Sequence, residues 1–338
     1  MKERVVVKVG SNTVLDRAGR FRPHLAVLAT ELAALHRGGA DVALVTSGGI
    51  ARGLRSLHVT RRTKRMKRDL QAASAVGQPD VYSHFEQLFA RQRPRLATAQ
   101  VLFTFAEITE LHHFRNVQQA LTQLVEWRVV PIINENDTTT MDDITFENND
   151  YLAAQVANML RATRLVLFTN VDGVFTANPQ ASSGAELIEE ITDVKDALTR
   201  YRIKKGAAQL GTGGMYSKVV AAEMAAASGT RVTIANGVKA DSLRAALRGE
   251  RVGTIFPPAA GRQKKVFPRR DWIRSRRPKG SIYVDAGAAR ALRTAGASLL
   301  PVGVVRVGGS FGREAIVDVL HEDELLGKGI VALSASQL

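Results

Sequence analysis

The feature that most constrains the fold is the alternation of short apolar runs with longer stretches of helical periodicity over residues 1–255. Strands buried on both faces are nearly continuous apolar runs, and parallel strands need a long crossover, usually a helix, to connect them. The alternation therefore predicts an α/β fold with a mainly parallel sheet between helices. The predicted strands are 4–9, 41–46, 95–103, 128–134, 164–169 and 231–235, and the predicted helices are 24–37, 69–92, 107–127, 149–161 and 214–228.

The amino-acid composition changes after Phe256. Residues 257–278 are rich in Pro, Gly and Arg, which is typical of a linker. Beyond them, short β-type runs with glycines at the turns and one short helical stretch predict a small, mostly β domain over 279–338. We therefore expect a first domain over 1–256, a basic linker and a second domain.

Composition narrows the class of protein. The chain has 338 residues, 45% of them hydrophobic, which is enough for a sizeable core. It has no cysteine, which excludes disulfides and thiolate metal sites and fits a reducing compartment. The sequence shows neither a signal peptide nor an apolar run of membrane-spanning length, so we expect a cytoplasmic protein with no membrane partner.

Most of the formal net charge of +15 comes from two basic segments, 61–68 and 262–279. Such runs are usually solvated surface, but runs this dense can also attract the phosphates of a nucleotide or of RNA. Phe267, Trp272, Tyr283 and Phe311 are the aromatic residues that could stack on RNA bases in this part of the chain. RNA therefore remains an alternative partner.

Glycine-bearing turns follow predicted strands or precede a predicted helix at 8–12, 46–53 and 211–218. In parallel sheets, ligands bind at the carboxyl ends of the strands, where glycines let backbone N–H groups approach an anion. Three such turns favour an anion site over three purely structural turns. The sequence has neither a P-loop motif nor a dinucleotide-binding motif after the first strand.

Two lysines fit an anion site. Lys8 lies inside the apolar run VVVKVG, where an unpaired ammonium is costly, and Lys218 ends the turn GTGGMYSK. Two lysines and glycine-turn amides suit phosphoryl transfer, which depends on positioning and charge neutralisation. The acidic segment 134–150, NENDTTTMDDITFENND, fits a metal cluster, a substrate clamp or a solvated loop by composition alone.

The motifs VVVKVGS, VTSGGIARG, QAASAVGQ, VVPIINENDT, NNDYLAAQVA, LFTNVDGVFTANP and GTGGMYSK resemble, in this order, those of the amino-acid kinase superfamily and of its glutamate 5-kinases. SLLPVGV in the tail resembles the PUA domain, an RNA-binding type of module, that follows the kinase domain in many bacterial members. The resemblance implies a three-layer αβα sandwich and a PUA-like domain. Because the chain ends at Leu338, where relatives typically continue, the second domain is expected to be truncated.

The resemblance also implies roles for the motif residues. The implied catalytic residues are Lys8, Lys218 and Asp150, with Asp150 orienting both lysines. The implied glutamate-binding residues are Ser47, Gly48, Gly49, Asp137 and Asn149. The implied nucleotide-binding residues are Lys8, Thr169, Asn170, Thr212, Gly213, Gly214, Met215, Tyr216, Ser217 and Lys218.

The implied reaction is phosphorylation of the γ-carboxylate of L-glutamate by ATP, the first step of proline biosynthesis. Mg²⁺ would be carried by the ATP phosphates, so no dedicated metal ligands are expected. The family further implies proline as a feedback inhibitor, a homo-oligomer (dimer or tetramer), and delivery of the labile acyl phosphate to the next enzyme. A related kinase acting on another acid is the enzymatic alternative, and an RNA-binding protein is the non-enzymatic one.

The sequence departs from the family pattern at two positions. Asn148 and Asn170 stand where relatives usually carry aspartate, and each change removes one negative charge from the expected site. We expect these changes to affect substrate or nucleotide affinity. Asp142, Asp143 and Glu147 are expected to be solvated charges of the loop.

Overall fold

The computed structural model describes residues 2–59, 67–104, 107–139, 148–179, 181–203, 214–259, 273, 278–294, 299–313 and 315–338. The chain forms two compact units, Met1–Gln263 and Lys264–Leu338. The boundaries predicted from composition, 1–256 and 279–338, remain predictions.

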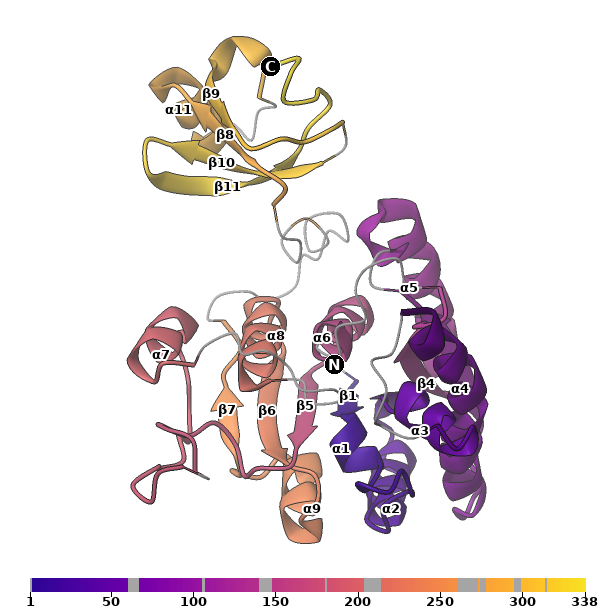
Figure 1. The fold of residues 1–338 in the computed structure, drawn as a ribbon. Helices are drawn as coiled ribbons and strands as arrows, with labels where there is room; N and C mark the ends of the chain where they lie inside the picture. The colour runs from indigo at the N-terminus through magenta and orange to yellow at the C-terminus, as the bar shows by residue number, and fades with distance from the viewer. Residues whose placement is uncertain are drawn as a thin grey trace. The chain divides into compact units, whose positions relative to one another are not determined.

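Unit 1 is built on a seven-stranded sheet in the order β3-β4-β2-β1-β5-β6-β7 (Figure 1). Neighbouring strands pair in parallel, except that β6 and β7 pair antiparallel. The central β1 is the apolar run RVVVKV, and its valines are buried because helices cover both faces of the sheet. The strands are β1 (Arg4–Val9), β2 (Asp41–Val45), β3 (Thr98–Phe103), β4 (Val130–Glu135), β5 (Arg164–Thr169), β6 (Arg231–Asn236) and β7 (Thr254–Phe256).

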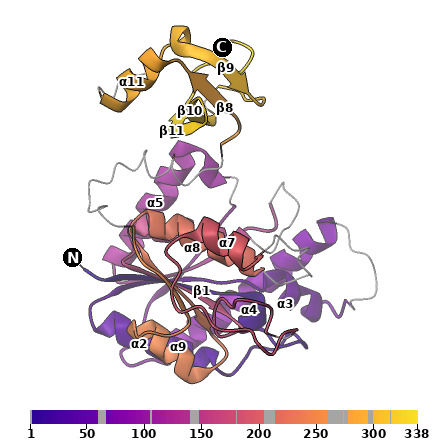
Figure 2. The same ribbon diagram turned by 90° about the vertical axis from the view of Figure 1, so that its left-hand side faces the viewer.

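Helices lie on both sides of this sheet. Helices α2 (Leu25–Arg37), α4 (Lys67–Ala90) and α9 (Ala240–Arg248) share one hydrophobic core with the strands. Helices α5 (Leu111–Glu126), α6 (Asn148–Leu160) and α8 (Met215–Ala227) contact the sheet as well. Figure 2 shows α2 and α9 on one side of the sheet and α5 and α8 on the other. The predicted three-layer αβα sandwich is confirmed.

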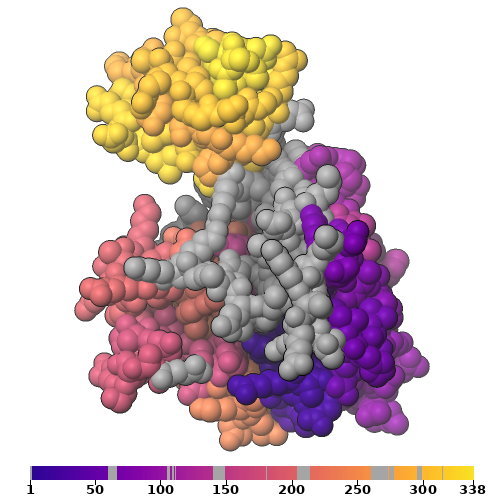
Figure 3. Space-filling view, viewed as in Figure 1, coloured from indigo at the N-terminus to yellow at the C-terminus, as the bar shows by residue number. Residues whose placement is uncertain are grey.

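Shorter elements complete unit 1 and include most of what the sequence patterns did not predict. They are α1 (Ser11–Val14), α3 (Gly49–Ser56), η1 (Glu107–Thr109) and α7 (Val194–Arg200). These elements are short, as are α9 and β7. A short element has too few residues for its hydrophobic periodicity to be recognised in the sequence. On the face in Figure 3, the early residues of unit 1, coloured indigo and purple, and residues 170–203, in rose, lie on opposite sides.

Glycines bring α3 and α4 into unusually close contact. A Cβ on Gly53 would lie 1.7 Å from the carbonyl oxygen of Ala73, and a Cβ on Gly77 would lie 1.9 Å from that of Gly49. No side chain can occupy either place, so the two backbones touch. Gly53, which belongs to the glycine-bearing turn 46–53, therefore serves the packing of α3 on α4. This contact fixes the orientation of α4 and thus the side of it that carries Ser74 and Gln78.

Unit 2 contains a four-stranded sheet in the order β11-β10-β8-β9. Pairs β10–β11 and β8–β9 are antiparallel, and β10–β8 is parallel. Its elements are β8 (Ser281–Val284), α11 (Ala286–Thr294), η2 (Pro301–Gly303), β9 (Val304–Gly308), β10 (Ile316–His321) and β11 (Glu324–Ile330). This small, mostly β unit agrees with the predicted second fold class.

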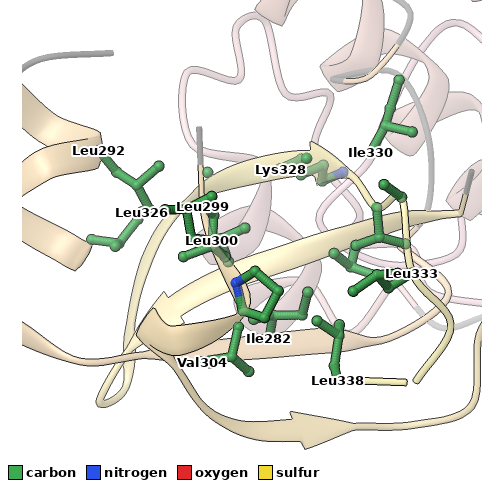
Figure 4. A pocket seen from close by; sticks show the side chains of 17 residues that line it. Ile282, Leu292, Leu299, Leu300, Val304, Leu326, Lys328, Ile330, Leu333 and Leu338 are labelled. Atoms are coloured by element: carbon green, nitrogen blue, oxygen red, sulfur yellow. The ribbon is translucent and has the colours of Figure 1, made fainter. Parts of the chain in front are cut away.

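An apolar cavity of about 570 Å³ lies within unit 2 (Figure 4). Leucine, isoleucine and valine side chains dominate its lining, and among the described residues that line it Lys328 has the one charged side chain. All of its lining residues belong to unit 2.

Among the described helices, none combines the length and the apolar character that crossing a membrane requires.

The contact between α3 and α4 predicts that Gly53→Ala destabilises unit 1. The added methyl group would overlap the carbonyl of Ala73, and overpacking of this kind costs about 1–3 kcal/mol. The matched control is Gly184→Ala, because a Cβ there meets no atom within 4 Å. Urea unfolding of the three proteins measures the effect, and equal midpoints for the two variants would contradict this contact.

Candidate active site

A buried carboxylate between two ammonium groups forms the centre of the site. Asp150, in the first turn of α6, is fully buried. Its Oδ1 lies 2.5 Å from Lys8 Nζ, and its Oδ2 lies 3.0 Å from Lys218 Nζ. Lys8 is near the carboxyl end of β1, and Lys218 is in the first turn of α8. The structure thus brings the three predicted catalytic residues together.

The charges of this cluster depend on one another. Burial lowers the pKa of Lys8 from 10.5 to about 8, although Asp150 opposes the shift. Burial by itself raises the pKa of Asp150, but Lys218 and Lys8 outweigh burial and lower that pKa to about 2. Two ammonium groups share one carboxylate, so the cluster keeps an excess positive charge near neutral pH. That charge suits an anionic ligand.

Ser217 ties the carboxylate to the start of α8. Its hydroxyl is fully buried and lies 2.9 Å from Asp150 Oδ2 and 2.8 Å from the carbonyl oxygen of Gly214. A hydroxyl has one proton, so it donates to one of these acceptors at a time. The hydroxyl of Ser217 is therefore engaged within the protein, whereas Met215 and Tyr216 beside it are half-buried.

The second glycine-bearing turn joins β2 to α3. Ser47 is buried at this turn, Gly48 caps α3 with a φ of 111°, and Gly49 is the first residue of the helix. The positive φ of Gly48 is costly for residues with a side chain, which explains the glycine there. Ser47 Oγ lies 2.8 Å from Ser11 Oγ, at the start of α1.

Asp137 follows β4 and is half-buried. Ser74 Oγ of α4 donates a hydrogen bond to Asp137 Oδ2 at 3.3 Å. Burial raises the pKa of Asp137 from 3.8 to about 6, and the hydrogen bond from Ser74 opposes the shift. A carboxylate that is costly to ionise gains most from a cationic partner, such as the ammonium of an amino acid.

Amide side chains connect Asn149 to the sheet. Asn149 Oδ1 accepts a hydrogen bond from the backbone N–H of Glu135 at 3.2 Å. Asn134 Nδ2 donates to Gln78 Oε1 at 3.0 Å, and Gln78 Nε2 donates to the carbonyl of Glu135 at 3.2 Å. The network fixes the end of β4 against α4 and α6, which sets the position of Asp137.

The expected nucleotide side lies at the ends of β5 and β6. Thr169 is buried at the end of β5, and Asn170 beside it is exposed. Nearby, Asn236 Nδ2 donates to Asp172 Oδ1 at 2.9 Å, and Lys239 Nζ donates to Asp172 Oδ2 at 2.8 Å. The pKa of Asp172 lies below its ordinary value, mainly because of the hydrogen bond from Lys239 and to a lesser degree because of the one from Asn236.

Some predicted residues lie outside the described part of the chain. They are Thr212, Gly213, Asp142, Asp143, Glu147, Phe267 and Trp272, and most of both basic segments. For Asn148 the backbone is described and the side chain is not.

Of the four aromatic residues that we considered for RNA stacking, the structure describes two, Tyr283 and Phe311, and both are engaged. Phe311 belongs to the hydrophobic core of unit 2 and is 6% exposed. Arg306 covers the ring of Tyr283, with its Cζ 3.7 Å from the ring centroid. The prediction of RNA binding therefore depends on the basic segments.

Sequence reasoning missed Ser11, Ser74, Gln78 and the group Asp172, Asn236 and Lys239. Ser74 and Gln78 are four residues apart and thus on one face of α4, which is a readable signal once α4 is known to face the site. The others are polar residues at the ends of short elements or in the segments between them. The contacts that reveal them join segments far apart in the sequence.

Two family models and several glutamate 5-kinases match the chain. A model of the amino acid kinase family matches residues 3–236, and a model of the PUA domain matches residues 280–338. The glutamate 5-kinase of Meiothermus ruber is 40% identical to the chain over 337 residues, which cover 99% of this chain and 87% of the relative. The glutamate 5-kinase of Rhodopseudomonas palustris strain BisA53 is 41% identical, with coverage of 98% and 87%.

Solved structures share the fold of unit 1 at low sequence identity. The UMP kinase of Bacillus anthracis superposes with a TM-score of 0.52 at 18% identity, over 76% of this chain and 97% of that chain. An isopentenyl phosphate kinase gives a TM-score of 0.51 at 15% identity, over 75% and 100%. These likenesses concern the fold alone.

Proposed function

The chain belongs to the amino acid kinase family and, within it, to the glutamate 5-kinases, and we propose that it transfers the γ-phosphoryl group of ATP to the γ-carboxylate of L-glutamate. The product is L-glutamyl 5-phosphate, the first intermediate of proline biosynthesis. The observation that carries the proposal is the buried carboxylate of Asp150 between Lys8 and Lys218.

In this proposal the two lysines contact the oxygens of the phosphoryl group as it moves. Phosphoryl transfer needs positioning and neutralisation of charge more than covalent chemistry. Asp150 keeps both ammonium groups together, and without it their mutual repulsion would separate them. The pKa of Lys8, about 8, leaves the group mostly protonated at pH 7, and bound phosphates favour its protonated form.

Glutamate requires no general base. Its γ-carboxylate is ionised at pH 7, so an oxygen of it attacks the γ-phosphorus directly. One O–P bond forms, the bond from the γ-phosphorus to the bridging oxygen of ADP breaks, and no proton is transferred. The obstacle is repulsion between the two anions, which the excess positive charge of the lysines offsets.

Asp137 is the proposed partner of the glutamate ammonium, with Ser47, the amides of Gly48 and Gly49, and Asn149 holding its polar groups. The raised pKa of Asp137, about 6, supports this role because a cation stabilises its ionised form. An N-acetylated acid has no ammonium to offer, so Asp137 argues against the related kinases that act on acetylated substrates. Aspartate remains the alternative acid.

ATP is proposed to bind near Thr169, Asn170 and the turn at residues 212–218. Both oxygens of Asp150 face ammonium groups at 2.5 and 3.0 Å, so this carboxylate does not fit as a metal ligand. Mg²⁺ would be carried by the ATP phosphates, and it would supply neutralisation of their negative charge.

Three further partners follow from the proposed reaction. Proline shares an α-carboxylate and a cationic nitrogen with glutamate, so we propose that it competes near Asp137. The acyl phosphate product hydrolyses readily, which favours prompt delivery to the next enzyme. A homo-oligomer and a cytoplasmic location remain predictions.

The direct test is glutamate-dependent formation of ADP from Mg-ATP, with hydroxylamine trapping the product as a hydroxamate. We expect Lys8→Ala to lower kcat by at least about 100-fold, since neutralisation of transition-state charge has effects of this size. Lys195→Ala is the matched control, because Lys195 is an exposed lysine of α7. Circular dichroism checks the fold of both variants.

Absence of glutamate-dependent turnover in the wild type would refute the proposed function. Normal turnover by Lys8→Ala would refute the role of Lys8. A panel with aspartate and N-acetylglutamate distinguishes the related acid kinases.

The pKa of Asp137 predicts an acid limb in the pH profile. Asp137 must be ionised to hold the ammonium, so kcat/KM for glutamate should fall about tenfold per unit of pH below about 6. Above about 8, the loss of the Lys8 proton should lower kcat/KM again. Steady-state kinetics between pH 5 and pH 9 measures both limbs.

Ser74→Ala provides the control for this assignment. The hydrogen bond from Ser74 lowers the pKa of Asp137, so its removal should move the acid limb to higher pH and leave the alkaline limb in place. An acid limb that does not move in Ser74→Ala and persists in Asp137→Asn would show that another group titrates.

A further inference from the structure

The two turns at the ends of β1 and β2 are joined by a pair of hydroxyl groups. Ser11 Oγ and Ser47 Oγ lie 2.8 Å apart, a distance typical of a good hydrogen bond between hydroxyls. Ser47 is buried, and Ser11 is half-buried. Thirty-six positions separate them in sequence. The contact therefore joins the turn beside Lys8 to the turn assigned to the acid substrate.

Ser11 is also linked to the catalytic lysine through the backbone. A Cβ on Gly10, the residue before Ser11, would lie 3.3 Å from Lys8 Nζ, so the Gly10 backbone passes directly over this ammonium group. Gly10 also caps α1, where its carbonyl accepts hydrogen bonds from Thr13 and Val14. The segment 8–11 thus joins the ion pair of Lys8 with Asp150 to the hydroxyl pair of Ser11 and Ser47.

The chemistry of a hydroxyl pair decides what Ser47 can offer a ligand. Each hydroxyl has one proton, and one of the two donates to the other. If Ser47 donates to Ser11, it has only lone pairs to present, and lone pairs repel a carboxylate. If Ser11 donates to Ser47, the proton of Ser47 remains available to an anionic oxygen. Binding of an acid therefore requires Ser11 to be the donor.

We propose that Ser11 is a positioning residue that donates to Ser47 and so orients the Ser47 hydroxyl as a donor to a carboxylate of the substrate. This inference rests on the proposed function, because it assumes that the substrate is an acid and that Ser47 binds it. It adds a residue that the motif resemblance did not assign, and it gives Ser11 a role through another side chain rather than through the reacting atoms.

The test is a double-mutant cycle on Ser11 and Ser47. Ser11→Ala should raise KM for glutamate about three- to tenfold, the range of one net hydrogen bond, and leave kcat and KM for ATP unchanged. In the Ser47→Ala background, Ser11→Ala should have no further effect, because its partner is absent. Ser11→Thr retains the hydroxyl and should restore the wild-type KM.

Controls separate positioning from a general loss of stability. Ser182→Ala, at an exposed loop serine, should leave every kinetic constant unchanged. Thermal unfolding of each variant shows whether the fold is intact. Equal rises of KM for glutamate and ATP would overturn the proposal, as would effects of the two alanine substitutions that simply add.

The outcome for the wild type separates this inference from the proposed function. If the wild type phosphorylates another acid of the panel and not glutamate, the proposed function fails, and the same cycle is measured with that acid. If glutamate is the substrate and the cycle shows no coupling, the inference about Ser11 fails while the function stands.

Discussion

The site depends on one interaction, the contact of the buried Asp150 carboxylate with Lys8 and Lys218. Removal of Asp150 would leave two buried ammonium groups without their carboxylate, which typically costs about 3–5 kcal/mol. The excess of positive over negative charge also means that the cluster is incomplete without an anion. A single arrangement thus explains how charged residues can be buried here and why the cluster suits an anionic ligand.

The architecture of unit 1 follows from the need to bring these three residues together. Lys8 comes from the central strand, while Asp150 and Lys218 come from the first turns of α6 and α8, which lie at the carboxyl ends of the parallel strands. The close contact of α3 with α4 through Gly53 and Gly77 then fixes the opposite wall, where Ser74 reaches Asp137. The packing of Gly53 and Gly77 thereby helps to set the positions of Ser74 and Asp137.

The sequence allowed the layers of unit 1 to be predicted, because apolar runs and glycine turns indicate the ends of parallel strands. The resemblance of the motifs to one family allowed the grouping of Lys8, Asp150 and Lys218 to be predicted. The sequence could not reveal Ser11, whose partner Ser47 lies in the turn after another strand, or the group around Asp172. Helix α3 was hidden because a glycine-rich segment signals a turn, and its packing on α4 through Gly53 and Gly77 is a long-range contact. Long-range contacts were thus the missing information.

The measurement that tests the central claim most directly is the pKa of Lys8, obtained by NMR titration of its ¹⁵N-labelled ammonium group. The account predicts a value of about 8 in the wild type, below the ordinary 10.5, because the group is buried. It also predicts a still lower value in Asp150→Asn, since Asp150 is the group that raises it. A wild-type value near 10.5 that does not change in the variant would contradict the buried pairing of Asp150 with Lys8.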